Sequence, residues 1–121
     1  LWLAHTVFLP AGGTPTRSAV QWWQLNPSLG VTQFGRVQDS TGTNFYAFPS
    51  IAVNRFNDVL IGFSRYSSNQ YVSANYAFRA FNDSLNTMQT ERASWRTTSR
   101  RISSAISATR RSSSSSAIFA G

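Results

Sequence analysis

The chain has 121 residues, of which 41% are apolar, 14% aromatic and 12% charged, and a formal net charge of +7. A chain of this length buries one modest core, so we expect a single domain. The absence of cysteine excludes disulfides and thiolate metal sites, and no apolar run approaches the roughly 20 residues that a membrane-spanning helix needs.

Six short strands are predicted in chain order, separated by segments rich in Gly, Pro, Asn, Asp and Ser. The first alternates apolar residues on both faces, which is typical of a strand buried on both sides. Pro49 is expected at the start of the fourth strand, because proline has no N–H to donate. The sequence NRFND at 54–58 predicts a tight hairpin. The predicted strands are residues 1–8, 18–25, 31–37, 50–53, 59–66 and 71–79.

Alternation shows which residues share a face of the predicted sheet. In the fifth strand these are Val59, Ile61 and Phe63. In the sixth strand, one face carries Val72, Ala74, Tyr76 and Phe78, and the other carries Ser73, Asn75 and Arg79. No segment with helical periodicity lies between the strands, so we predict an all-β, antiparallel architecture. A piece of a β-sandwich and a piece of a β-propeller share this pattern.

Residues 89–121 lose the strand pattern. Residues 1–90 hold five Arg against three Asp, a net +2, whereas residues 91–121 hold six Arg against one Glu, a net +5. Serine makes up about one-third of this tail, so we expect it to be disordered or to form a weak helix from about residue 91 to 110. The sequence thus predicts two regions, a folded part at 1–88 and a Ser/Arg-rich tail at 89–121.

The segments SAVQWWQLNPSLGVTQFGRVQD and FYAFPSIAVNRFNDVLIGFSRYSSNQYVSANYAFR resemble sialidase-like β-propeller repeats of the BNR or Asp-box type in large exported bacterial proteins. The resemblance covers residues 1–88, and PSIAVN with DVLIGFSR is its more specific part. It implies four-stranded blades, with residues 1–37 as the last three strands of one blade and 48–79 as the first three of the next. The chain would then be about one and a half blades of a β-propeller-like fold.

The resemblance also implies a secreted or cell-surface location in a bacterium and neighbouring blades of a longer chain as partners. We expect the chain to be an internal fragment, because it begins at Leu1 without a leader pattern. The segment 81–88 corresponds to an Asp-box turn but keeps only Asp83 and Thr87 of its pattern. Because the change in composition falls inside a repeat, we hypothesise that the tail is read out of frame.

Catalytic chemistry finds little support in the residue types. The single histidine, His5, has no nearby partner for metal binding or base catalysis and is expected to be hydrogen-bonded within a sheet. Asp39, Asp58 and Asp83 lie in predicted turns, where Asp bonds the local backbone. A sialidase-like site would need a tyrosine activated by a glutamate, and the single Glu, Glu91, lies in the tail. The sequence therefore nominates no catalytic, metal or cofactor-binding residue.

Two groups of residues are candidates for binding. A surface for carbohydrate or protein is predicted from Trp22, Trp23, Tyr46, Arg65 and Tyr66, with core packing as the alternative for the aromatic residues. Adjacent Trp22 and Trp23 point to opposite faces, so at most one of them fills a given core. Nucleic-acid contacts are predicted from the Arg pairs of the tail, Arg100, Arg101, Arg110 and Arg111.

The favoured function is a non-catalytic scaffold or a module that binds carbohydrate or protein. The first alternative is a small basic protein that binds nucleic acid through its tail. The second is a fragment of a sialidase-like glycosidase that lacks most of its active site.

Overall fold

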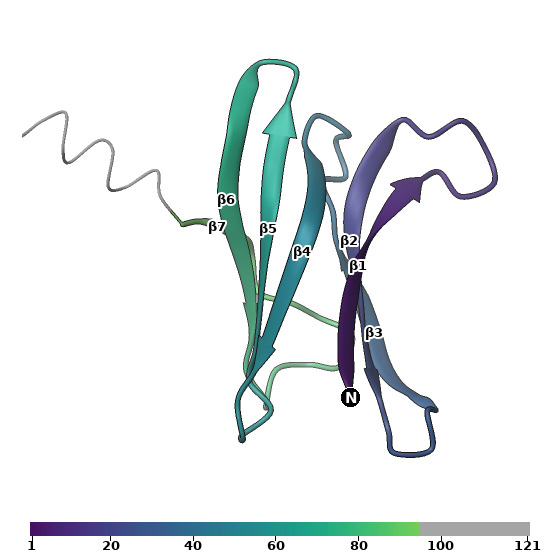
Figure 1. Ribbon diagram of the computed structural model, residues 1–121, viewed down its shortest axis with the longest axis vertical. Coiled ribbons are helices and arrows are strands. Elements are labelled where there is room, and N and C mark those ends of the chain that lie inside the picture. The colour runs from purple at the N-terminus through teal and green to yellow at the C-terminus, as the bar shows by residue number, and fades with distance from the viewer. Residues whose placement is uncertain (95–121) are drawn as a thin grey trace, which may run out of the picture.

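The computed structural model describes residues 1–94, which form two antiparallel sheets standing side by side (Figure 1). Sheet A has the order β1-β2-β3, and sheet B has the order β4-β5-β6-β7. Each strand within a sheet pairs with the next along the chain, and no helix occurs in residues 1–94. The all-β prediction is confirmed. The strands are β1 (Trp2–Leu9), β2 (Arg17–Leu25), β3 (Val31–Val37), β4 (Phe45–Val53), β5 (Val59–Ser67), β6 (Gln70–Arg79) and β7 (Arg92–Ala93).

The predicted number of six strands is wrong, because β7 adds a fourth strand to sheet B. Its residues pair with Asn75 and Tyr76 of β6, and the Ser94 backbone N–H donates to the Ala74 carbonyl at 2.8 Å. A two-residue strand is too short to show alternation, which is why the pattern missed it. The weak helix predicted from residue 91 is replaced by β7 at its start, and its remainder lies outside the described residues.

Strand β4 begins five residues earlier than predicted, at Phe45. The pairing with β5 shifts between Ala47 and Ser50, and Phe48 has a φ of 55°. Pro49 therefore sits in a β-bulge, where the ladder does not need its missing N–H. Proline is usually confined to strand ends, and for this reason the sequence pattern predicts a strand that starts only after the bulge.

The predicted hairpin at 54–58 is confirmed. The Asn54 side-chain oxygen accepts hydrogen bonds from the backbone N–H groups of Phe56 and Asp58 at 2.8 and 3.0 Å. Asn57 has a φ of 67°, which Asn tolerates better than most residues. The side chain of Asn54 thus replaces the backbone partners that the turn lacks.

The core lies between the two sheets. Sheet A contributes Trp22 and Val20, which are fully buried, and sheet B contributes the face that carries Val59, Ile61 and Phe63, as predicted. The burial predicted on both faces of the first strand is wrong: apart from the buried Leu9, the residues of β1 are partly buried or exposed, because β1 lies at one edge of sheet A. The buried core residues are Val20, Trp22, Tyr46, Val59, Ile61, Phe63 and Ala77.

Gly35 in β3 makes room for the largest of these side chains. A Cβ atom at Gly35 would lie 2.5 Å from the Trp22 ring, a distance that real carbon atoms do not reach. Gly35 therefore marks a close approach of the β3 backbone to the Trp22 ring.

The segment between β6 and β7 connects the two sheets. Asn86 accepts a hydrogen bond from the Phe34 N–H at 2.9 Å with its side chain and donates its own N–H to the Gln33 side chain at 3.2 Å. Both partners belong to β3 of sheet A. Arg79 fixes the start of the segment by donating to the carbonyls of Ala80 and Asp83 at 2.9 Å. Through these contacts, the segment that follows strand β6 of sheet B is hydrogen-bonded to sheet A.

Candidate binding surfaces

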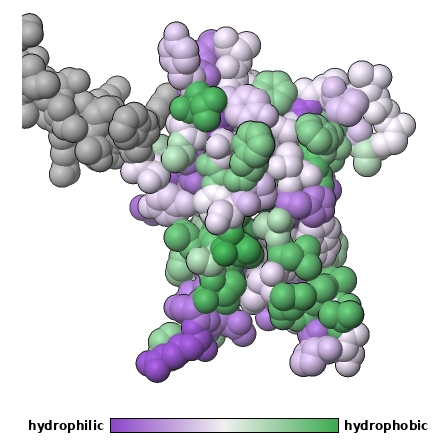
Figure 2. Space-filling model, viewed as in Figure 1, coloured by the Kyte–Doolittle hydropathy of each residue, from purple (hydrophilic) through white to green (hydrophobic). Residues whose placement is uncertain are grey.

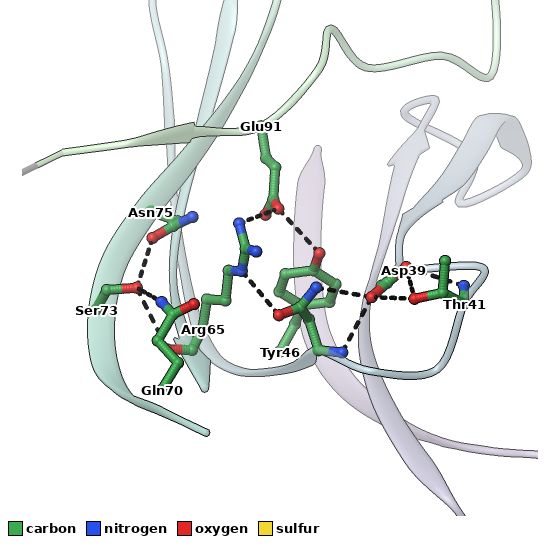
Figure 3. A network of polar contacts seen from close by, with 9 residues as sticks. Asp39, Thr41, Tyr46, Arg65, Gln70, Ser73, Asn75 and Glu91 are labelled. Carbon is green, nitrogen blue, oxygen red and sulfur yellow. Dashed lines mark hydrogen bonds and ion pairs between the residues drawn. The ribbon is translucent and has the colours of Figure 1, made fainter. Parts of the chain in front are cut away.

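A polar network links sheet B to the segment that precedes β7 (Figure 3). The Arg65 guanidinium forms an ion pair with Glu91 at 2.9 Å, and the Tyr46 hydroxyl donates to the same carboxylate oxygen at 3.0 Å. Both side chains come from adjacent strands, because Tyr46 of β4 is the cross-strand partner of Arg65 of β5. Glu91 is thus held by two neighbours on the inner face of sheet B.

The network continues into the loop that precedes β4. Arg65 donates to the Asn44 side chain at 3.2 Å, and Asn44 donates to Asp39 at 2.7 Å. Asp39 also accepts from the hydroxyl and the backbone N–H of Thr41. These bonds, those from Thr41 above all, lower the Asp39 pKa to about 2. The carboxylate therefore organises the loop as a charged acceptor across the neutral range.

An open hollow of about 360 Å³ lies beside this network, between the end of β3, the start of β4 and residues 88–91. Polar side chains line much of it, among them Arg36, Asp39 and Asn44. The second oxygen of Glu91, Oε2, is buried and has no hydrogen-bond partner. The hollow is therefore lined by positively charged, negatively charged and amide side chains, which can bind a small polar ligand.

Tyr46 is not prepared to act as a nucleophile. Burial, followed by the negative charge of Glu91, raises the pKa of the Tyr46 hydroxyl above its ordinary range. The hydroxyl therefore keeps its proton and acts as a hydrogen-bond donor. Within residues 1–94, no group of three or more His, Cys, Asp or Glu side chains is placed to hold a metal ion. In the same range, no helix is long and apolar enough to cross a membrane.

The five candidate contact residues do not form one surface. Tyr46 and Arg65 meet at Glu91, but Trp22 is fully buried in the core and does not reach a ligand at the surface. Trp23 points to the opposite side of sheet A and stacks on His5, with ring centres 4.9 Å apart. Tyr66 stacks on Phe45 at 5.8 Å, and Arg100, Arg101, Arg110 and Arg111 lie outside the described residues.

The single histidine and the predicted turn carboxylates have structural contacts. The His5 ring lies 2.8 Å from the Thr6 carbonyl oxygen through Nδ1. The Asp58 side chain accepts from the Asn54 amide and from the Phe81 N–H, and Asp83 accepts from the Ala80 N–H. These groups are occupied by the protein itself.

Strand β6 presents its apolar side on the outward face of sheet B. Burial shows that Ser73, Asn75 and Arg79 point inward, whereas the alternating set that begins at Val72 points outward. Val72 is 68% exposed, and Leu60 of the neighbouring β5 is 43% exposed. In Figure 2, apolar residues reach the surface over much of the lower half of the molecule, and the β4–β5 hairpin at the lower left is hydrophilic. The apolar side chains of sheet B are therefore divided between the core and the solvent.

The outward face of sheet B is hollowed into an open groove of about 570 Å³. Phe48, projecting from the β4 bulge and 80% exposed, forms one part of the lining. Leu60 and Tyr76 also line the groove, and Gly62 leaves open space where another residue would place a Cβ. We call this surface, formed by Phe48, Leu60, Gly62, Ala74 and Tyr76, the B groove.

Sheet A also carries apolar residues on its outward face. Trp23 pairs with Leu3 on one side and with Phe34 on the other, so the three side chains share this face. Phe34 is 53% exposed, and the other two are partly buried. We call the surface formed by Leu3, His5, Val7, Trp23 and Phe34 the A face.

Sequence reasoning missed Glu91 and the direction of β6. Glu91 was assigned to the unpatterned tail, and no local signal places it beside Arg65, because the contact depends on the path of the chain between β6 and β7. The alternation of β6 was visible, but it does not tell which side faces the core.

Comparison with known proteins found no match to this chain among family models, curated proteins or solved structures.

Proposed function

We propose that this chain is a non-catalytic scaffold whose two outward sheet faces bind other protein surfaces. The observation that carries the proposal is the pair of apolar surfaces, the A face and the B groove, on opposite sides of a sheet stack. Large contiguous apolar surfaces on soluble proteins usually mark interaction sites. The pattern of exposure therefore favours protein partners over a polar ligand at these faces.

The β-propeller relationship is part of this proposal. The consecutive order β4-β5-β6-β7 and the packing of sheet A on sheet B support a stack of repeated four-stranded sheets. A location in a bacterial exported protein follows from the sequence resemblance and remains a prediction. The raised pKa of Tyr46 makes this residue a poor nucleophile at neutral pH, in keeping with a binding role for its hydroxyl.

Binding of an apolar dye that fluoresces in nonpolar environments tests the proposal. We expect dye binding to the full chain, with reduced binding in Leu60→Asp and in Phe34→Asp, each of which places a charge on one outward face. Leu29 and Phe56 are also exposed but lie in turns, so Leu29→Asp and Phe56→Asp are matched controls. Dye binding that neither face variant reduces, or hydrolysis of a fluorogenic sialoside, would contradict the proposed function.

A second candidate is the binding of a small carbohydrate in the hollow beside Tyr46. It is favoured by the Arg36, Asp39 and Asn44 groups that line the hollow, since sugar hydroxyls both donate and accept hydrogen bonds. Titration with mono- and disaccharides, followed by NMR, tests it. Shifts in Asn44 and Gln89 side-chain amides that disappear in Glu91→Ala are expected, and shifts that persist in this variant would contradict it.

A further inference from the structure

The buried face of sheet A and the exposed B groove are built on the same pattern. In sheet A, the small residue Ala4 pairs with the large aromatic Trp22. In sheet B, the small residue Gly62 pairs with the aromatic Tyr76. In each sheet, the strand that carries the aromatic residue then pairs with the last strand of the sheet: β2 with β3, and β6 with β7. The two aromatic residues therefore occupy equivalent positions, one covered and one open.

The equivalence extends to the residues on either side. Two positions before the small residue stands a large apolar one, Trp2 in sheet A and Leu60 in sheet B. Two positions after it stands a hydroxyl residue, Thr6 or Ser64. In sheet A this surface is covered by sheet B, whereas in sheet B the matching residues form the B groove.

The opposite faces match at three positions. On the A face, Leu3 is followed by His5, whose cross-strand partner is the amide residue Gln21. On the inner face of sheet B, Ile61 is followed by Phe63, whose cross-strand partner is the amide residue Asn75. At these three positions the A face resembles the surface with which sheet B covers sheet A, whereas Val7 and Trp23 stand where sheet B has Arg65 and Ala77.

We propose that the B groove of one copy of this chain binds the A face of a second copy. The contact would resemble the packing of sheet B on sheet A within the chain, because the B groove has the pattern of the covered face of sheet A and the A face shares three positions with the face of sheet B that covers it. This inference rests on the proposed function, and it adds the identity of the partner. Since the two surfaces differ, the association is head-to-tail and continues beyond a dimer unless the rotation closes a ring.

Sedimentation velocity on the full 121-residue chain tests the proposal. We expect a mean mass that rises with protein concentration beyond that of a dimer. Leu60→Asp blocks the groove and Phe34→Asp blocks the A face, so each variant alone should weaken self-association by at least about tenfold. The controls Leu29→Asp and Phe56→Asp should associate like the unmodified chain.

Mixing the two blocked variants gives the decisive measurement. Leu60→Asp keeps an intact A face and Phe34→Asp keeps an intact groove, so the mixture should form a 1:1 dimer and no larger species. Formation of this dimer also shows that both variants are folded. If either variant has lost its cooperative unfolding transition, the mixing experiment is repeated with Leu60→Thr and Phe34→Thr.

Three outcomes would overturn the head-to-tail contact. The first is an unmodified chain that stays monomeric at all concentrations. In that case the groove would be covered by another protein or by another part of the same chain. The second is folded variants that do not pair on mixing. The third is a Phe34→Asp variant that still dimerises, which indicates a symmetric contact of groove with groove. If one of these results is found but both face variants still reduce dye binding, the proposed function stands. Only the proposal that a second copy is the partner is then rejected.

Discussion

The layer between the two sheets differs from one end of β5 to the other. At the Val59 end, Val59 and Ile61 pack in the core with Trp22 of sheet A, and the buried Arg79 beside Val59 donates to the carbonyls of Ala80 and Asp83. At the Arg65 end, the same face carries charged and amide groups, which are satisfied by Glu91, Asn44 and their neighbours. The first end is stabilised mainly by burial of apolar surface and the second mainly by hydrogen bonds between side chains.

Removal of the tryptophan ring from the apolar end should have the largest effect. Trp22→Ala leaves a cavity among fully buried neighbours, and we expect a loss of about 3–5 kcal/mol in the free energy of unfolding. Urea denaturation measures it at one fixed protein concentration. Trp23→Ala, on the partly exposed side of the same strand, is the matched control, and equal losses in both variants would remove the distinction between the two faces.

The space beside the same ring is tested by adding one methyl group. In Gly35→Ala the new Cβ would overlap the Trp22 ring, so the ring or β3 must move, and we expect a loss of about 1–3 kcal/mol. Gly62→Ala is the control, because nothing lies within 4 Å of its Cβ position. Near-ultraviolet circular dichroism of the tryptophan band should change in the first variant and not in the second.

The polar end should respond more weakly to loss of its ion pair. Glu91→Gln keeps an acceptor for Tyr46 but removes the charge that pairs with Arg65. The two side chains are partly exposed, so screening by solvent limits the expected loss to about 1 kcal/mol. A double-mutant cycle with Arg65→Gln measures the coupling, which should decrease at high salt. Additive effects of the two substitutions would show that the pair contributes nothing.

The smallest effect is expected from alkaline pH. Because the Tyr46 pKa is raised in the folded state, its contribution to stability is complete below the pKa of the unfolded chain, about 10, and is lost as pH rises above that value. Between pH 8 and 11, the unmodified chain should lose up to about 1 kcal/mol that Tyr46→Phe does not lose. Unfolding curves at the two pH values measure this difference, and identical losses would contradict it.

The parts of the fold that were predictable depend on local chemistry. Strand β3 has the predicted bounds, and the hairpin at 54–58 follows from one asparagine side chain. The parts that were not predictable depend on tertiary contacts. Glu91 reaches Arg65 only because β7 pairs with β6, and the inward side of β6 is polar because its partners are Gln70, Arg65 and the neighbouring amides. Hydrophobic alternation places Val72 and Phe78 on one face of β6 but does not indicate that this face lies on the solvent side.

The contact between Asn86 and β3 has a consequence for how the chain is made. Sheet A is synthesised before β4, β5 and β6, so its Trp22 face packs on sheet B only after those strands have been made. The hydrogen bonds of Asn86 to Gln33 and Phe34 join positions more than 50 residues apart, so they form only after the segment that follows β6 has been synthesised. A chain interrupted before that segment would therefore lack the contacts through which this segment joins the two sheets.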